Sequence, residues 1–144
     1  MATSVKTLLA NKKIKSLLSV TPSTTVYDAL IIMSENNIGA LLVMEDQKLV
    51  GIFSERDYAR KGIIKGRKAN TTSISEVMTP NVYTVNPGMN IVECMEIMSS
   101  RKFRHLPVVD HDTVIGILSV GDIVTALIIE QKTHINFLES YISG

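Results

Sequence analysis

The sequence is an internal duplication, and this feature constrains the fold more than any other. When the sequence is shifted by 65 positions, residues 20–57 align with residues 85–122 without a gap. Eleven of these 38 positions are identical, namely Val20, Pro22, Ile32, Met33, Ser34, Leu41, Val43, Gly51, Ile52, Ser54 and Asp57 in the first copy. A match this regular predicts two copies of one structural unit.

Each copy begins with the pattern of an amphipathic helix. Apolar residues recur at i, i+3, i+4 and i+7, as Val26, Ala29, Leu30 and Met33 in the first copy and Ile91, Cys94, Met95 and Met98 in the second. Thr25 with Asp28, and Asn90 with Glu93, have the spacing of capping boxes at the starts of these helices.

A β-hairpin is predicted next in both copies. Two short apolar runs, 39–44 and 49–54 in the first copy, are joined by a four-residue polar connection, 45–48. The second copy repeats this pattern from Phe103, with its polar connection at 110–113. A second helix is expected to start at Ser54 or Ser119, and in the second copy its buried face is predicted to carry Ile123, Leu127 and Ile128.

Short extended segments, 16–20 and 81–85, precede the two copies, and residues 58–80 are expected to form a polar linker. A unit of about 50–60 residues has little core of its own. We therefore expect an α+β fold in which the two copies pack as a pseudo-twofold pair.

Composition excludes several classes of function. The net charge is +1, which argues against a nucleic-acid or membrane-surface binder, and no apolar run approaches the length of a membrane span. Three histidines and one cysteine show no metal-ligand spacing, and no glycine-rich phosphate loop is present. Cys94 is expected to be a buried, inert thiol. We expect a cytoplasmic protein that is not an enzyme, with no catalytic residue, no catalytic cofactor and no metal.

Several motifs resemble those of the CBS domain. GIFSERD at 51–57 and GILSVGD at 116–122 close the second strand of each copy, RHLPVVD spans 104–110, and EVMTPNVYTVNPG spans 76–88. Two such domains in tandem form a Bateman module, and the chain resembles small stand-alone CBS-pair proteins. The resemblance implies a first CBS repeat at 8–66, a second at 74–131 and a C-terminal helical tail at 132–144.

The repeated Ser-x-x-Asp has two interpretations, which are compatible. Ser54 with Asp57, and Ser119 with Asp122, have the spacing of a capping box, and an acidic residue in the first turn suits the helix dipole. The family resemblance implies that the two aspartates, helped by the serines, accept hydrogen bonds from the ribose diol of a nucleotide.

The resemblance also implies where the rest of a nucleotide would bind. The base would lie against Leu18 and Ile38 in the first copy, and against Tyr83 and Phe103 in the second. The alternative for all four residues is ordinary core, and for Leu18 and Ile38 individually this alternative is favoured. Candidate phosphate ligands are Arg56 in the first copy and Arg104 and His105 in the second. Because these cations differ between the copies, we hypothesise that the two sites prefer different ligands.

The function implied by the family is that of a regulatory sensor. It would bind an adenosine-containing ligand (AMP, ADP, ATP or NAD(H)) in a cleft between the repeats and signal energy or redox state to an unidentified protein target. Two alternatives remain: a structural or adaptor dimer that binds no ligand, and a module that binds S-adenosyl methionine. A homodimer is expected, and Ile135, Leu138 and Ile142 in the tail have the spacing of one helix face.

Overall fold

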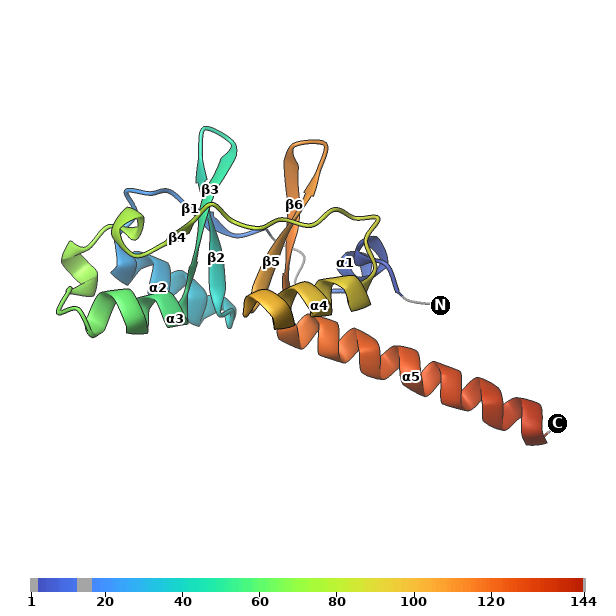
Figure 1. Cartoon of the computed structure of the whole chain (residues 1–144). Helices are drawn as coiled ribbons and strands as arrows, with labels where there is room; N and C mark the ends of the chain where they lie inside the picture. Colours follow the sequence, from blue (N-terminus) through green and yellow to red (C-terminus); the bar gives the residue numbers. More distant parts are fainter. Residues whose placement is uncertain (1–2, 13–16, 144) are drawn as a thin grey trace. The chain divides into compact units, whose positions relative to one another are not determined.

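The computed structural model describes residues 3–12 and 17–143, which belong to two compact units (Figure 1). Residues 17–83 form one unit, the first-repeat unit. Residues 3–12 pack with residues 84–143 in the other, the second-repeat unit. The second-repeat unit is therefore not one continuous stretch of the chain, because residues 3–12 belong with residues 84–143.

The first-repeat unit is built on a four-stranded sheet of order β1–β2–β3–β4. Its strands are β1 (Ser19–Val20), β2 (Ala40–Glu45), β3 (Lys48–Ser54) and β4 (Thr79–Pro80), with β1 parallel to β2 and the other pairs antiparallel. Its helical elements are α2 (Val26–Asn36), the short α3 (Glu55–Asp57), the π-helix η1 (Tyr58–Ile63) and two single 3₁₀ turns, η2 (Ala69–Thr71) and η3 (Ile74–Glu76).

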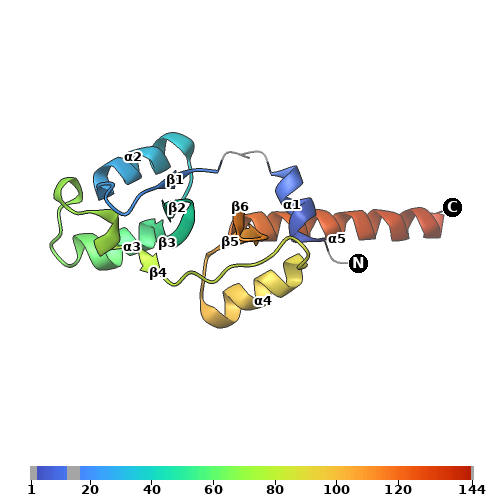
Figure 2. The same ribbon diagram turned by 90° about the horizontal axis from the view of Figure 1, so that it is seen from above.

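The second-repeat unit repeats the hairpin as β5 (His105–Asp110) and β6 (Thr113–Ser119). Val85 forms a parallel bridge to Val108 at the position where Val20 of β1 pairs with Val43. Its helices are α1 (Val5–Asn11), α4 (Ile91–Arg101) and α5 (Val120–Ser143). Seen from above, α1 lies beside the first half of α5, and the second half of α5 extends past α1 and α4 (Figure 2).

The predicted helix faces are confirmed in both repeats. Val26, Ala29 and Met33 of α2 are buried, and Leu30 packs against the same core. Ile91, Cys94 and Met98 of α4 are buried, and Met95 packs beside them. Asn90 and Glu93 form the predicted reciprocal capping box, whereas Thr25 accepts from the backbone N–H of Asp28 without a return bond.

Both hairpins are tighter than the sequence predicts. The strands run to Glu45 and Lys48, so that only Asp46 and Gln47 form the turn, with φ values of 50° and 66°. His111 and Asp112 form the same turn in the second repeat, with φ values of 49° and 66°. Two consecutive left-handed residues match the right-handed twist of the flanking strands. The four-residue connection predicted for each hairpin was wrong for this reason.

Two leading segments, residues 3–12 and residues 72–80, dock onto their units in the same way. The amide of Val5 donates to the carbonyl of Met89 at 2.8 Å, and the amide of Ile74 donates to the carbonyl of Thr24 at 2.8 Å. Met89 and Thr24 are equivalent positions of the two repeats, 65 residues apart. Each leading segment therefore precedes one repeat in the sequence and packs within the unit of the other repeat.

This docking overturns the prediction of a polar linker over residues 58–80. Ile74 and Val77 are fully buried in the core of the first-repeat unit, and Thr79 and Pro80 add strand β4 to its sheet. The prediction failed because residues 65–73 are mostly polar, and Ile74 and Val77 alone are too short a pattern to indicate a buried segment.

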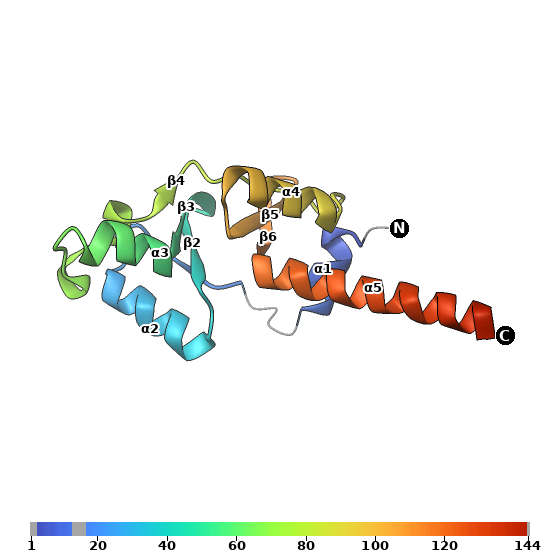
Figure 3. The same ribbon diagram turned by 60° about the horizontal axis from the view of Figure 1, so that its bottom comes forward.

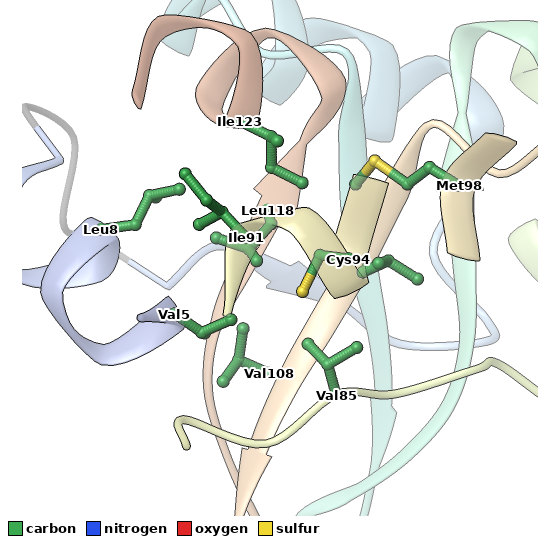
Figure 4. Packing of buried hydrophobic residues seen from close by; sticks show 10 residues of the cluster. Val5, Leu8, Val85, Ile91, Cys94, Met98, Val108, Leu118 and Ile123 are labelled. Atoms are coloured by element: carbon green, nitrogen blue, oxygen red, sulfur yellow. The ribbon is translucent and has the colours of Figure 1, made fainter. Parts of the chain in front are cut away.

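The core of the second-repeat unit includes two residues of its leading segment. Val5 and Leu8 of α1 point toward Ile91, Leu118 and Ile123, which come from three other elements (Figure 4). Ile123 and Leu127 lie on this side of α5 as predicted, but Ile128 is 51% exposed, so its predicted burial was wrong. The predicted helical tail at residues 132–144 is helical as far as Ser143, and it continues α5 (Val120–Ser143) without a break.

Cys94 is buried in this core. Burial, with the carboxylate of Glu93 nearby, raises the pKa of the Cys94 thiol. A thiol that is buried and protonated at neutral pH is a poor nucleophile. The prediction of a buried cysteine is confirmed.

Candidate functional site

Two corners, where the second strand of each hairpin turns into a helix, contain the candidate aspartates. We call residues 51–57 the first corner and residues 116–122 the second corner. At the first corner, Ser54 Oγ accepts from the amide of Asp57 at 3.2 Å, and Asp57 Oδ2 accepts from the amide of Ser54 at 2.9 Å. At the second corner, the corresponding distances for Ser119 and Asp122 are 3.0 and 2.8 Å. The predicted capping role is confirmed at both corners.

The backbone geometry around the two corners is also the same. The amide of Glu55 donates to the carbonyl of Gly39 at 3.2 Å, and the amide of Val120 donates to the carbonyl of Arg104 at 3.0 Å. These bonds connect the start of each helix to the residue that precedes the first hairpin strand. Both corners are thus fixed by backbone bonds as well as by their serine and aspartate side chains.

The glycine that opens each corner allows a leading segment to approach closely. A Cβ atom at Gly51 would lie 2.6 Å from Met78 Sδ and 3.0 Å from the carbonyl oxygen of Thr79. A Cβ atom at Gly116 would lie 2.8 Å from Leu9 Cδ2. Each corner is therefore covered by a leading segment, and the glycines make room for it.

At the first corner, the Asp57 carboxylate has partners on both oxygens. Oδ2 accepts from the backbone and hydroxyl of Ser54, and Oδ1 accepts from the hydroxyl of Thr79 at 3.0 Å. Lys61 Nζ lies 3.7 Å from Oδ1 and also donates to the carbonyl of Met78 at 3.3 Å. The side chain of Asp57 is 12% exposed. The group of the leading segment that lies closest to the Asp57 carboxylate is thus the neutral hydroxyl of Thr79 in β4.

At the second corner, the leading segment contributes a charge. Lys12 Nζ lies 2.9 Å from Asp122 Oδ2 and donates to the carbonyl of Ile117 at 2.8 Å. The side chains of Lys12 and Asp122 are 21% and 24% exposed. This ion pair is partly buried and joins residues far apart in the chain.

Sequence reasoning missed Thr79 and Lys12. A signal was present, since TSVKTLL at 3–9 resembles TSISEVM at 72–78. Their offset is 69 rather than 65, so the alignment of the repeats does not include them. The resemblance places Leu9 opposite Met78, and these are the two residues that face the corner glycines.

Leu18 and Ile38, the base-binding candidates of the first copy, are half-buried and pack against the core of the first-repeat unit. Ile38 also lines a pocket of about 430 Å³. Its other lining residues come from the end of α2, the loop after it and the start of α3: Leu30, Met33, Ser34, Asn37, Gly39 and Glu55. This pocket therefore reaches from Ile38 to the first corner.

Tyr83 and Phe103, the base-binding candidates of the second copy, belong to different units. Phe103 is half-buried against the core of the second-repeat unit. Tyr83 is 36% exposed and ends the first-repeat unit. Their predicted shared role stays a prediction.

The three candidate phosphate ligands lie close to the corners in the chain or in the sheet. Arg56 precedes Asp57, is half-buried, and makes no side-chain hydrogen bond or ion pair with the residues that the structure describes. His105 pairs with Ser119 across the hairpin. Arg104 is exposed, and its carbonyl accepts from the start of α5.

Residues 3–12 and 17–143 contain neither a membrane-spanning helix nor a cluster of metal-binding side chains. No helix in these ranges has the length and apolar character needed to cross a membrane. No group of three or more His, Cys, Asp and Glu side chains within them is arranged to hold a metal ion.

Comparison with known proteins identifies the family. The CBS domain model matches twice, at residues 9–63 and 74–129. The mitochondrial CBS domain-containing protein CBSX3 of Arabidopsis thaliana is 39% identical over 134 residues, which cover 90% of this chain and 65% of CBSX3. This chain therefore spans about two thirds of the length of that relative.

Solved structures agree with this match. A CBS-domain protein from Burkholderia ambifaria has a TM-score of 0.86 and 40% identity, covering 90% of this chain and 96% of its own. The structure of CBSX2 in complex with AMP has a TM-score of 0.73 and 29% identity, covering 88% of this chain and 97% of its own. The prediction of two tandem CBS repeats with an α+β fold is confirmed, and the chain belongs to the CBS domain family.

Proposed function

We propose that this CBS pair is a sensor that binds adenosine-containing ligands, with Asp57 and Asp122 as the ribose acceptors. The observation that carries the proposal is the matched pair of corners, each of which holds a carboxylate in a fixed orientation at a strand end. A carboxylate that is already oriented can accept from a ribose diol without losing side-chain entropy on binding. The relative CBSX2 has been solved in complex with AMP, which supports the choice of ligand class.

The pocket at the first corner suits the base and sugar better than the phosphate. Its volume of about 430 Å³ lies within the range of small-molecule sites, about 300–1,000 Å³. Leu30, Met33 and Ile38 supply apolar surface, while the carboxylate of Glu55 would repel an anion. We assign the phosphate to Arg56, which has no partner among the described residues.

Signalling would follow from differential affinity. A ligand shifts the protein between two states only as far as it binds one of them more tightly. In this proposal the bound nucleotide selects one state of the module, which a separate protein target recognises. The chain itself carries out no chemical step.

A thermal-shift screen tests the proposal, with AMP, ADP, ATP, NAD, NADH and S-adenosyl methionine as probes. A ligand present at about 100 times its dissociation constant stabilises the folded protein by roughly 2.7 kcal/mol. Asp57→Ala and Asp122→Ala should each remove one site as counted by calorimetry. A chain that stays folded and gives no shift with any probe at millimolar concentration would overturn the proposal. A shift with S-adenosyl methionine alone would change the ligand class.

An exposed row on α5 favours a second function, that of a dimerising adaptor. Four apolar residues along the helix are 41–51% exposed: Val124, Ile128, Ile135 and Leu138. Their spacing of four, seven and three residues follows a heptad repeat, and the polar Gln131 occupies the position between Ile128 and Ile135. Figure 3 shows how far this helix extends beyond α1 and α4. The side chain of Ile142, predicted to continue the row, lies outside the described residues.

The occupant that suits this row is a second copy of the chain. A polar residue inside an apolar heptad row is best satisfied by the same residue of an identical helix. Sedimentation of Ile135→Glu against Ile129→Glu, which lies off the row, tests this. Loss of the dimer only in Ile135→Glu is expected, and a monomeric wild-type chain at high concentration would refute the pairing.

A further inference from the structure

The Lys12–Asp122 ion pair occupies an atom that the proposed ribose contact would use. Lys12 Nζ lies 2.9 Å from Asp122 Oδ2, the same oxygen that accepts from the amide of Ser119 at 2.8 Å. An ammonium group has three N–H donors, and Lys12 directs a second one to the carbonyl of Ile117 at 2.8 Å. The lysine is therefore held at the second corner by two contacts rather than reaching it from solvent.

A ligand that binds Asp122 must share this carboxylate with Lys12 or displace the lysine. Displacement by a neutral ribose leaves an ammonium group, 21% exposed, beside one carbonyl and without a counter-charge. A partly buried charge without a partner is costly. A ligand that also carries a phosphate returns a counter-charge to the lysine, whose four-carbon stem allows the ammonium to follow it.

The first corner lacks this requirement. Its leading segment gives Asp57 the hydroxyl of Thr79, at 3.0 Å. A hydroxyl can rotate, and it both donates and accepts, so a neutral ligand can replace it without leaving a charge behind. Lys61 is also near, but it lies 3.7 Å from Asp57, and its side chain is 41% exposed, so that water can solvate it.

We propose that Lys12 is a specificity-determining residue of the second corner, which selects ligands bearing an anionic group beside the ribose over neutral nucleosides. This inference rests on the proposed function, because it assumes that Asp122 accepts a ribose. Lys12 lies within the first CBS match, residues 9–63, but before residue 20, where the alignment between the two repeats begins.

Calorimetry in an Asp57→Ala background isolates the second corner, with AMP and adenosine as the probes. AMP should bind at least about tenfold more tightly than adenosine, which corresponds to about 1.4 kcal/mol. Adding Lys12→Met should reduce this preference about tenfold, because adenosine no longer leaves an ammonium without a counter-charge and AMP loses its cationic partner. Lys12→Arg should retain most of the preference. Lys6→Met, at an exposed position of the same leading segment, removes the same charge and should leave the preference unchanged.

The outcomes separate this inference from the proposed function. Equal losses for AMP and adenosine in Lys12→Met, or an unchanged preference, would overturn the role of Lys12 alone. Binding by the wild-type chain that disappears in the Asp57→Ala background would show that the second corner is not a site. No binding of either probe by the folded wild-type chain would overturn the proposed function itself. If Lys12→Met fails to fold by circular dichroism, Lys12→Gln replaces it.

Discussion

The two corners have the same backbone and the same serine and aspartate, yet different groups face their carboxylates. Asp57 receives the hydroxyl of Thr79 from one leading segment, and Asp122 receives the ammonium of Lys12 from the other. Thr79 and Lys12 lie outside the aligned residues 20–57 and 85–122. The segment that covers each corner therefore sets which group faces its carboxylate.

The largest expected effect tests whether the leading segments are part of the cores. Ile74→Ala removes a fully buried side chain from the second leading segment and should lower the free energy of unfolding by about 2–5 kcal/mol, as measured by urea denaturation. Ile64→Ala is the matched control, because Ile64 is 76% exposed, and it should change stability by at most about 0.5 kcal/mol. Equal, small losses in both variants would mean that this segment does not dock in solution.

The corner glycines should differ in their tolerance of a methyl group. In Gly51→Ala the new Cβ meets Met78 Sδ and the backbone carbonyl of Thr79, so we expect a loss of about 1–3 kcal/mol. In Gly116→Ala it meets only the end of the Leu9 side chain, which can rotate away, and the loss should be below about 1 kcal/mol. Thermal unfolding of the two variants measures the difference. A larger loss of stability in Gly116→Ala than in Gly51→Ala would contradict the closer backbone approach at the first corner.

Removing each carboxylate should separate the capping role from the charge. Asp57→Ala and Asp122→Ala both lose an acceptor for the amide of a serine, and each should cost about 1–2 kcal/mol. Only at Asp122 is a short ion pair lost as well, and exposed or partly exposed pairs weaken with salt. Urea denaturation measures the loss of unfolding free energy in each variant. Raising the salt from a low concentration to 1 M NaCl should reduce this loss more for Asp122→Ala than for Asp57→Ala. Identical salt responses would indicate that Lys12 and Lys61 act alike.

The hydrogen bond between Thr79 of β4 and Asp57 should contribute less to stability than either carboxylate. Thr79→Val keeps the shape of the side chain and removes the hydroxyl that donates to Asp57, at an expected cost of about 0.5–1.5 kcal/mol. In a double-mutant cycle with Asp57→Ala, most of this cost should disappear. Additive effects of the two substitutions would show that the hydroxyl has another partner in solution.

The smallest expected effect concerns a position where the repeats differ in chemistry. Cys94 corresponds to Ala29, and burial raises the pKa of its thiol. Because the pKa is higher in the folded than in the unfolded chain, stability should fall as the pH rises above the usual thiol range. Cys94→Ala should remove this part of the pH dependence in urea titrations between neutral and alkaline pH. If the unfolding free energy of Cys94→Ala fell with pH as steeply as that of the wild-type chain, the pH dependence would come from other groups.

Local spacing was enough to predict the helix faces, the hairpins and the capped corners, because each of these depends on residues within one repeat. The leading segments were missed because their apolar residues, such as Ile74 and Val77, find partners far along the chain. The burial of Ile128 was predicted wrongly. Helical periodicity predicts which residues share one face of a helix, but it does not show how far along the helix that face is covered by the rest of the protein. Lys12 and Thr79 could not be paired with the aspartates from the alignment, since neither lies within it.

The docking of each leading segment also determines the order in which the chain can fold during synthesis. Residues 17–83 contain everything that the first-repeat unit needs, so it can form as soon as they leave the ribosome. Residues 3–12 are made before them but belong to a core completed by β6 and α5, so α1 must wait for almost the whole chain. Residues 3–12 are thus made before the first-repeat unit but pack into a core only after it. Each leading segment packs in the unit of the other repeat, as exchanged segments do in a domain-swapped dimer. Here the two repeats belong to one chain, so the exchange does not depend on protein concentration.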